Sequence, residues 1–179
     1  MAENMTGMTG LNETQLKALI EKATGLAYRY EQTHGGCAQV VLAAIRETLG
    51  KIGDDVFQAA TGLAGGAGRT GHACGALTGG IMALSCFWGR PWDDFADPGK
   101  RRTRCLEMSK RLVEKFQGQY DSADCHGIHR KILGRAYNLS DPQEFEQFVK
   151  AGGHDDKCPS VCANSVRWLI EILASEGLI

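Results

Sequence analysis

The segment GLAGGAGRTGHACGALTGGIMAL, residues 62–84, decides the fold, because its glycine-rich first half gives way to a helical pattern at Cys74. Its first nineteen residues contain eight glycines. Each glycine inside a helix costs about 1 kcal/mol relative to alanine, so the first half is predicted to be a loop. From Cys74 onward a helix is predicted, with Gly75, Gly79 and Ala83 at a spacing of four. Small residues at that spacing let another backbone approach closely, so tight helix packing is expected here.

Helical periodicity recurs on both sides of this segment, and no stretch alternates apolar and polar residues long enough to predict a strand. Asn12 and Gln15 predict a capping box before the first helix, which Gly35 and Gly36 are expected to end. Apolar faces and caps predict further helices over 37–49, 54–63, 98–120 (with Pro98 in the first turn), 128–133, 141–150 (with Pro142 at the first position) and 158–173. The sequence therefore predicts an all-α protein, a compact single-domain bundle of about seven or eight helices with a glycine-rich loop before the Cys74 helix.

The chain's length and charge exclude several classes of protein. Its 179 residues suit one domain, which we assign to 11–179, with a flexible N-terminus over 1–10. Twenty Lys and Arg residues against 21 Asp and Glu residues give a net charge of −1, which argues against a nucleic-acid partner. The longest uncharged stretch, 70–89, carries five glycines, so no membrane insertion is expected.

The seven cysteines are the strongest functional signal. An odd number cannot form a closed set of intramolecular disulfides. The first residues lack the basic and apolar regions of a secretory signal, so a cytoplasmic, reducing location is expected. In such a location, clustered thiols serve metal or redox chemistry more often than structural bridges.

Four cysteines are predicted in or beside the first turn of a helix: Cys37, Cys74, Cys125 and Cys162. The free N–H groups and the positive end of the helix dipole stabilise a thiolate there, which is the reactive and metal-binding form. No Cys-x-x-Cys motif is present, so any site must be assembled from distant segments.

The other three cysteines are weaker candidates. Cys86 and Cys105 lie within apolar patterns and are expected to pack as small hydrophobic residues. Cys158 lies one helical turn before Cys162, so the two can share a helix face.

The glycine loop is expected to wrap around the start of the Cys74 helix and aim backbone N–H groups at sulfur. Residues 66–71 match the dinucleotide pattern G-x-G-x-x-G, but the preceding segment is predicted to be helical instead of a strand, which disfavours nucleotide binding. Histidines near the cysteines (His34, His72, His126 and His154) are further candidates, with His72 preferred because it lies in the loop. The expected cofactor-binding residues of the loop region are Gly66, Gly68, Gly71, His72 and Gly75.

The chain resembles a family of redox-active proteins named for the pattern C-GCAxxG-C-C. The resemblance is carried in order by GGCAQVVLAA at Cys37, the segment around Cys74, DCHGI at Cys125, and CPSVCANSV near the C-terminal end, and it extends over about residues 25–175. It implies a small α-helical protein with four shared cysteines. A similar domain occurs in split-Soret cytochromes, for which an iron–sulfur cluster has been proposed.

By position, the resemblance assigns Cys37, Cys74, Cys125 and one of the two C-terminal cysteines. The Cys-Pro dipeptide favours Cys158. The Cys-x-x-x-Val spacing favours Cys162, as does the similarity between CAQVVLAAI from Cys37 and CANSVRWLI from Cys162.

We therefore expect an electron-transfer or redox protein in which Cys37, Cys74, Cys125 and Cys162, with Cys158 as the alternative fourth ligand, bind an iron–sulfur cluster of the [2Fe–2S] type. One alternative is a metal-free thiol–disulfide oxidoreductase with Cys74 as nucleophile and Cys37 as resolving thiol. Another is a structural module that holds zinc or copper(I). A protein redox partner is expected. The sequence does not decide whether the chain forms a homodimer through the face that carries Gly75 and Gly79. No enzymatic reaction beyond oxidoreduction is assigned.

Overall fold

The computed structural model describes residues 10–179, and in this range it contains eight α-helices and no β-strand, which confirms the predicted all-α fold. Residues 1–9, most of the segment expected to be flexible, lie outside the described residues. The helices are Glu13–His34 (α1), Cys37–Leu49 (α2), Asp54–Ala59 (α3), Gly75–Trp88 (α4), Arg101–Tyr120 (α5), Cys125–Leu133 (α6), Pro142–Lys150 (α7) and Cys158–Ser175 (α8). Short helical turns follow α3 (Ala60–Leu63, η1), α4 (Trp92–Asp94, η2) and α7 (Gly153–Lys157, η3).

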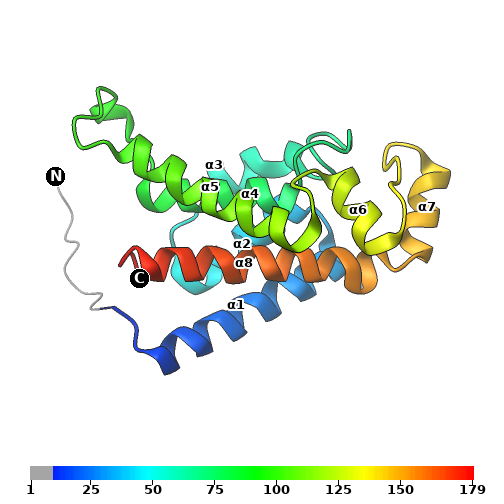
Figure 1. The fold of residues 1–179 in the computed structure, drawn as a ribbon, viewed down its shortest axis with the longest axis horizontal. Coiled ribbons are helices and arrows are strands. Elements are labelled where there is room, and N and C mark those ends of the chain that lie inside the picture. Colours follow the sequence, from blue (N-terminus) through cyan, green and yellow to red (C-terminus); the bar gives the residue numbers. More distant parts are fainter. Residues whose placement is uncertain (1–9) are drawn as a thin grey trace.

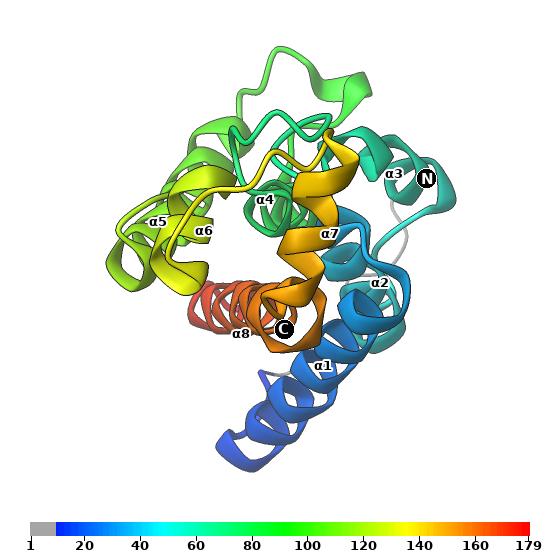
Figure 2. The same cartoon turned by 90° about the vertical axis from the view of Figure 1, so that its right-hand side faces the viewer.

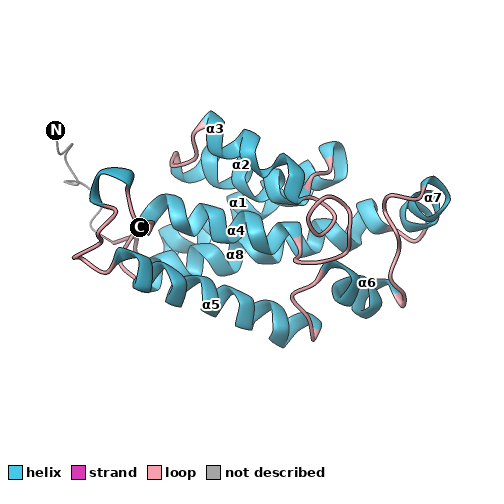
Figure 3. Cartoon of the chain, turned by 90° about the horizontal axis from the view of Figure 1, so that it is seen from above, coloured by secondary structure: helices cyan, strands magenta, loops and turns pink. Residues whose placement is uncertain are grey.

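Helix α8 runs through the middle of the bundle (Figure 1). It packs against α1, α2, α4 and α5, and its pairing with α1 is the most extensive helix contact in the described chain. Helices α6 and α7 lie together at one end of this bundle, as the end-on view shows (Figure 2). Loops join the helices without any sheet in the described chain (Figure 3).

Local sequence signals set most helix ends. The Asn12 side chain accepts a hydrogen bond from the Gln15 N–H at 2.9 Å, and the Gln15 side chain accepts one from the Asn12 N–H at 3.0 Å, which is the predicted capping box. Gly35, with φ of 63°, ends α1 as expected. Asp141 caps α7, and Pro142 occupies its first position.

The start of α5 differs from its prediction. Pro98 was expected in the first turn, but the helix begins at Arg101. The Asp97 carboxylate accepts hydrogen bonds from the N–H groups of Arg101 and Arg102, at 2.8 and 3.0 Å. Pro98 therefore lies in the turn before the helix, and the acidic side chain beside it satisfies the free N–H groups.

The small residues of α4 pack against α2 of the same chain. A Cβ atom added at Gly79 would lie 2.5 Å from the backbone oxygen of Ala38, so only glycine allows this approach. Gly75 and Gly79 are both buried. This contact confirms the predicted tight packing, and it contradicts a homodimer through the Gly75 and Gly79 face, because α2 already covers that face.

None of the helices in residues 10–179 is both long enough and apolar enough to span a membrane.

Candidate functional site

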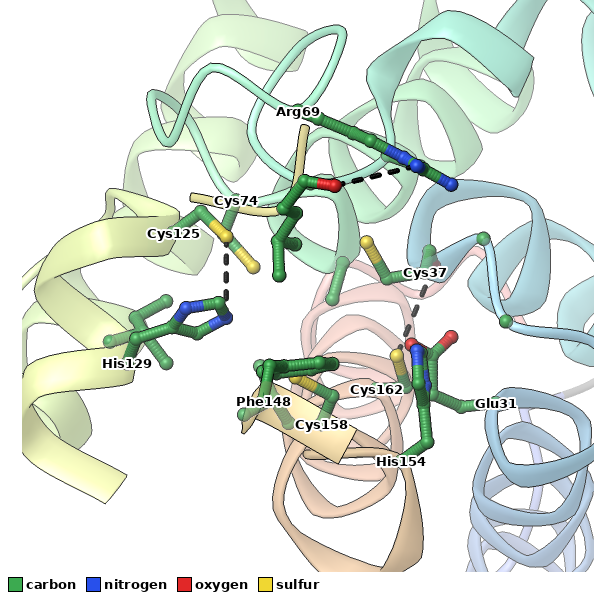
Figure 4. A pocket seen from close by; sticks show the side chains of 18 of the residues that line it. Glu31, Cys37, Arg69, Cys74, Cys125, His129, Phe148, His154, Cys158 and Cys162 are labelled. Atoms are coloured by element: carbon green, nitrogen blue, oxygen red, sulfur yellow. Dashed lines mark hydrogen bonds and ion pairs between the residues drawn. The ribbon is translucent and has the colours of Figure 1, made fainter. Parts of the chain in front are cut away.

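A cavity of about 200 Å³ lies at the end of the bundle where α6 and α7 meet the other helices (Figure 4). Five cysteines line it, and we call it the cysteine cavity: Cys37, Cys74, Cys125, Cys158 and Cys162. The four cysteines expected to form a site therefore lie around one space, together with the alternative fourth ligand. Cys86 and Cys105, which were expected to pack in the core, do not line the cavity.

Four helices begin at the cysteine cavity. Cys37, Cys125 and Cys158 are the first residues of α2, α6 and α8, and Cys74 directly precedes α4. None of these four helix starts has a side-chain cap hydrogen bond. The positive ends of these helix dipoles therefore lie around the cavity, an arrangement that favours a bound anion, although the N–H groups of Cys125 and Cys158 already donate to the His72 and Gly153 carbonyls.

Backbone pairing brings Cys74 and Cys125 together. The Cys74 N–H donates to the Ala123 carbonyl at 2.9 Å, and the Cys125 N–H donates to the His72 carbonyl at 2.7 Å. The two segments thus form a short antiparallel bridge just before α4 and α6. This bridge fixes two cysteines that lie far apart in the sequence on one wall of the cavity (Figure 4).

Close packing places the Cys37 sulfur against the start of α4. A Cβ atom at Gly75 would overlap the Cys37 Sγ, so glycine at this position leaves room for the sulfur. The backbone N–H groups of Gly65 and Ala38 lie near this sulfur and partly offset the effect of burial on its pKa. Gly75, one of the expected cofactor-binding residues, thus lies directly beside a cavity thiol, and Gly65 supplies a loop N–H group that the sequence did not single out.

Burial holds the cavity thiols in the protonated form. It raises the pKa of Cys74 and of Cys125 to about 12. It also raises the pKa values of Cys37, Cys158 and Cys162, and negative charge on Glu31 or on a neighbouring thiolate raises them further. Thiolates in this cavity therefore need a compensating positive charge, such as a metal ion.

A buried carboxyl group, Glu31, also faces the cavity, and the sequence analysis did not identify it. Glu31 is 3% exposed, and burial raises its pKa to about 7. Its Oε1 lies 3.6 Å from Nδ1 of His154, whose pKa burial lowers, while its Oε2 has no hydrogen-bond partner (Figure 4). The available signal was an acidic residue four positions after Ala27, on the apolar face of the first helix.

His129 is the second residue that the sequence analysis missed. Its Nε2 lies 3.5 Å from the Cys125 Sγ, and its ring is 2% exposed (Figure 4). Burial lowers its pKa to about 4, so the ring is neutral near pH 7. Its position four residues after Cys125, on the same face of a helix, could have identified it.

Several expected loop residues lie outside the cavity lining. The His72 side chain is exposed, although its backbone takes part in the bridge to Cys125. The N–H groups of Gly68, Gly71 and His72 donate to carbonyls of the loop itself or the preceding turn, on Gly62, Gly65 and Gly66, so they do not point at sulfur. Of the other candidate histidines, His34 and His154 line the cavity, whereas the His126 ring packs on Gly71.

The possible metal-ligating side chains are spread around the cavity and do not converge on a single metal position. Within residues 10–179, no three His, Cys, Asp or Glu side chains come close enough together to hold one metal ion. A single zinc ion needs four ligands about 2.0–2.3 Å away. A polynuclear group accepts thiolates at separate metal atoms, so five thiols spaced around a cavity suit such a group better.

Comparison with known proteins identifies a family. A family model described as "Putative redox-active protein (C_GCAxxG_C_C)" matches residues 36–172, which include all five cavity cysteines. An uncharacterized protein of Archaeoglobus fulgidus is 32% identical over 98 residues, covering 54% of this chain and 56% of that protein. The chain thus matches just over half the length of this relative. No solved structure matches the chain.

Proposed function

This chain belongs to the C_GCAxxG_C_C family, and we propose that its cysteine cavity binds an iron–sulfur cluster for electron transfer. The proposed ligands are Cys37, Cys74, Cys125 and Cys162, with Cys158 as the alternative fourth ligand, and the proposed cluster is of the [2Fe–2S] type. One observation carries this proposal: five thiols lie around a single buried cavity at four helix starts that have no side-chain cap.

Charge balance supports a metal-bound state. Burial, and to a smaller extent the negative charge of a neighbouring thiolate, raises the pKa of Cys74 and of Cys125 to about 12, so thiolates in this cavity require a cation. The core of an oxidised [2Fe–2S] cluster would compensate about half of the charge of four thiolates. A cluster with four thiolates keeps a net negative charge, which the four helix dipoles stabilise by roughly 0.3–1 kcal/mol each.

When bound, the cluster would accept and release one electron. The chain would hold the cluster, shield it from water and leave one side of it accessible to a redox partner. Apolar side chains of Ile128, Phe148 and Val161 line the cavity and exclude water. Cys74, Cys125 and Cys162 are buried, whereas Cys37 and Cys158 are only half-buried. We expect a protein redox partner to dock on the side of these last two residues.

The raised thiol pKa values weigh against the metal-free alternative. A thiol–disulfide oxidoreductase needs a nucleophilic thiolate near neutral pH. Cys74, the expected nucleophile, has its pKa raised to about 12 by burial, so almost none of it would be thiolate at pH 7. The zinc alternative is disfavoured by the lack of three converging ligands in the described chain.

The test is to purify the protein anaerobically and to measure iron, acid-labile sulfide and visible absorption. We expect brown protein, with iron and sulfide bound in equal amounts and absorption that bleaches on reduction. Colourless protein without iron and sulfide would overturn the proposal.

The same assay identifies the fourth ligand. We expect Cys162→Ser to lower the cluster content more than Cys158→Ser, because Cys162 is fully buried, with its Sγ 4.0 Å from the Cys37 carbonyl oxygen. The opposite order would assign the fourth ligand to Cys158.

A further inference from the structure

We propose that His129 donates a hydrogen bond from Nε2–H to the Cys125 sulfur and acts as a positioning residue that sets the redox potential of the group in the cysteine cavity. This inference rests on the proposed function, because it concerns a thiolate that is bound to metal. It adds a residue that is not itself a ligand.

The geometry places the two side chains in one rigid unit. His129 and Cys125 lie one turn apart on α6, with Nε2 and Sγ 3.5 Å apart (Figure 4). The His129 ring stacks on Phe148 with centroids 5.1 Å apart, and it meets the edge of Tyr137 at 6.2 Å. These aromatic contacts from outside α6 fix the direction in which the ring points.

The hydrogen-bonding capacity of the imidazole ring indicates that His129 is the donor and the Cys125 sulfur is the acceptor. A neutral imidazole has one N–H group, on either Nδ1 or Nε2. Nδ1 is buried and has no hydrogen-bond partner. If the proton were on Nδ1, the ring would bury an unpaired donor, whereas a proton on Nε2 is shared with sulfur and leaves only an unpaired lone pair. A thiolate is the better acceptor for this proton, so the arrangement favours a deprotonated Cys125.

Comparison with two other cavity thiols explains why a side-chain donor is needed to stabilise a thiolate at Cys125. Backbone N–H groups of Gly65 and Ala38 stabilise a thiolate at Cys37, and those of Ala76 and Leu77 do so at Cys74. At Cys125 the causes that shift the pKa are burial and the negative charges of Cys37, Glu31 and Asp124, with no backbone N–H group among them. His129 therefore supplies the hydrogen bond that the backbone provides at those two sites, and hydrogen bonds to cluster sulfurs raise the reduction potential.

The test compares the anaerobically loaded wild type with His129→Leu, His129→Gln and the control Gln117→Leu, in which the replaced side chain is uncharged, exposed and outside the cavity. Iron and sulfide per chain are measured first, and the midpoint potential is then determined by spectroelectrochemical titration. We expect His129→Leu to shift the potential to a more negative value, His129→Gln to restore part of the shift through its amide donor, and Gln117→Leu to leave the potential unchanged. An unchanged potential in loaded His129→Leu overturns this inference while the proposed function stands.

A second measurement needs no substitution at His129, in case the leucine variant does not fold or load. Pulsed EPR of the reduced wild type, labelled with ¹⁵N-histidine, should detect a weak nitrogen coupling typical of a hydrogen bond to a cluster ligand. No coupling, or a strong coupling typical of a metal-bound nitrogen, overturns the inference. If the wild type binds no iron or sulfide at all, the proposed function itself fails, so the two failures are distinguishable.

Discussion

The cysteine cavity and the contact between α4 and α5 both contain buried cysteines, but in different surroundings. Cys125 in the cavity and Cys105 on α5 are each 8% exposed. Cys105 is paired with a neutral hydroxyl, since its Sγ lies 3.4 Å from the Ser85 Oγ. Cys125 lies beside a histidine, at the start of a helix, in a cavity with four more thiols. Burial alone therefore does not distinguish these two cysteines, whereas the position at a helix start and the proximity of other thiols do.

The comparison is tested most directly by replacing one cysteine in the cavity and one in the contact between α4 and α5. In anaerobically prepared protein we expect Cys125→Ser to lower bound iron by at least about ten-fold, because a proposed ligand is lost. Cys105→Ser, with equal burial, should keep nearly the iron content of the wild type. Similar retention of iron by both variants would mean that Cys125 is not a ligand.

Thiol reactivity gives the next largest expected effect. In metal-free protein at pH 7.5, we expect Cys74 to react with iodoacetamide at least about ten-fold more slowly than free cysteine, because burial raises its pKa to about 12 and little thiolate is present. Mass spectrometry of alkylated peptides measures the rate, and all seven cysteines should react quickly in denaturant. A rate at Cys74 equal to that of free cysteine would favour the metal-free oxidoreductase instead.

The carboxyl group in the cavity makes the stability of the metal-free protein depend on pH. The pKa of Glu31 rises from 4.5 to about 7 on folding, so the folded state holds the proton more tightly. The contribution of Glu31 to the free energy of unfolding should therefore fall by up to about 3 kcal/mol as pH rises from 4.5 to 7, whereas His129 and His154, whose pKa values burial lowers, contribute in the opposite direction.

Denaturant titrations at several pH values test this dependence. In Glu31→Gln the free energy of unfolding should rise more steeply with pH than in the wild type, because the falling contribution is lost, whereas Glu107→Gln, a change on the exposed face of α5, should keep the wild-type dependence. The same pH dependence in Glu31→Gln and the wild type would show that Glu31 does not contribute in this way.

Two glycine substitutions, one in the contact between α2 and α4 and one on α5, should have the smallest effects. Gly79→Ala should lower the free energy of unfolding by roughly 1–3 kcal/mol, because the new Cβ would lie 2.5 Å from the Ala38 oxygen. Gly118→Ala on α5 should raise it by roughly 0.5–1 kcal/mol, since no heavy atom lies within 4 Å of the new Cβ. Chemical denaturation measures both changes, and equal effects would show that the close approach of α2 and α4 contributes nothing.

Local signals made most of the fold predictable. Asn12, Gly35 and Pro142 act on their own helix ends, so reading neighbouring residues was sufficient to place those ends. The start of α5 was placed too early, because Pro98 suits a first helical turn and also the turn before a helix. The side chain of Asp97 decided between the two.

The sequence predicted the cysteines that line the cavity, but it did not predict the other polar side chains that lie beside them. The cysteines carry a signal because they recur at helix starts, but their convergence depends on contacts between distant helices. Glu31 and His129 are single polar residues on mostly buried faces, and only the packed structure shows what they face. The loop glycines Gly66 and Gly71 were assigned to cofactor binding because their backbone was expected to face sulfur, whereas the loop bonds largely to itself.

The pairing of α1 with α8 has a consequence for the order of assembly. In a zinc finger the ligands are close in sequence, so metal binding can organise the chain. Here Cys37, at the start of α2, and Cys162, on α8, are 125 residues apart and meet only when α8 has packed against α1 and α2. Such distant contacts form late and slowly. We therefore expect the polypeptide to fold first and to receive its cluster afterwards, so that incorporation begins with a structured apoprotein.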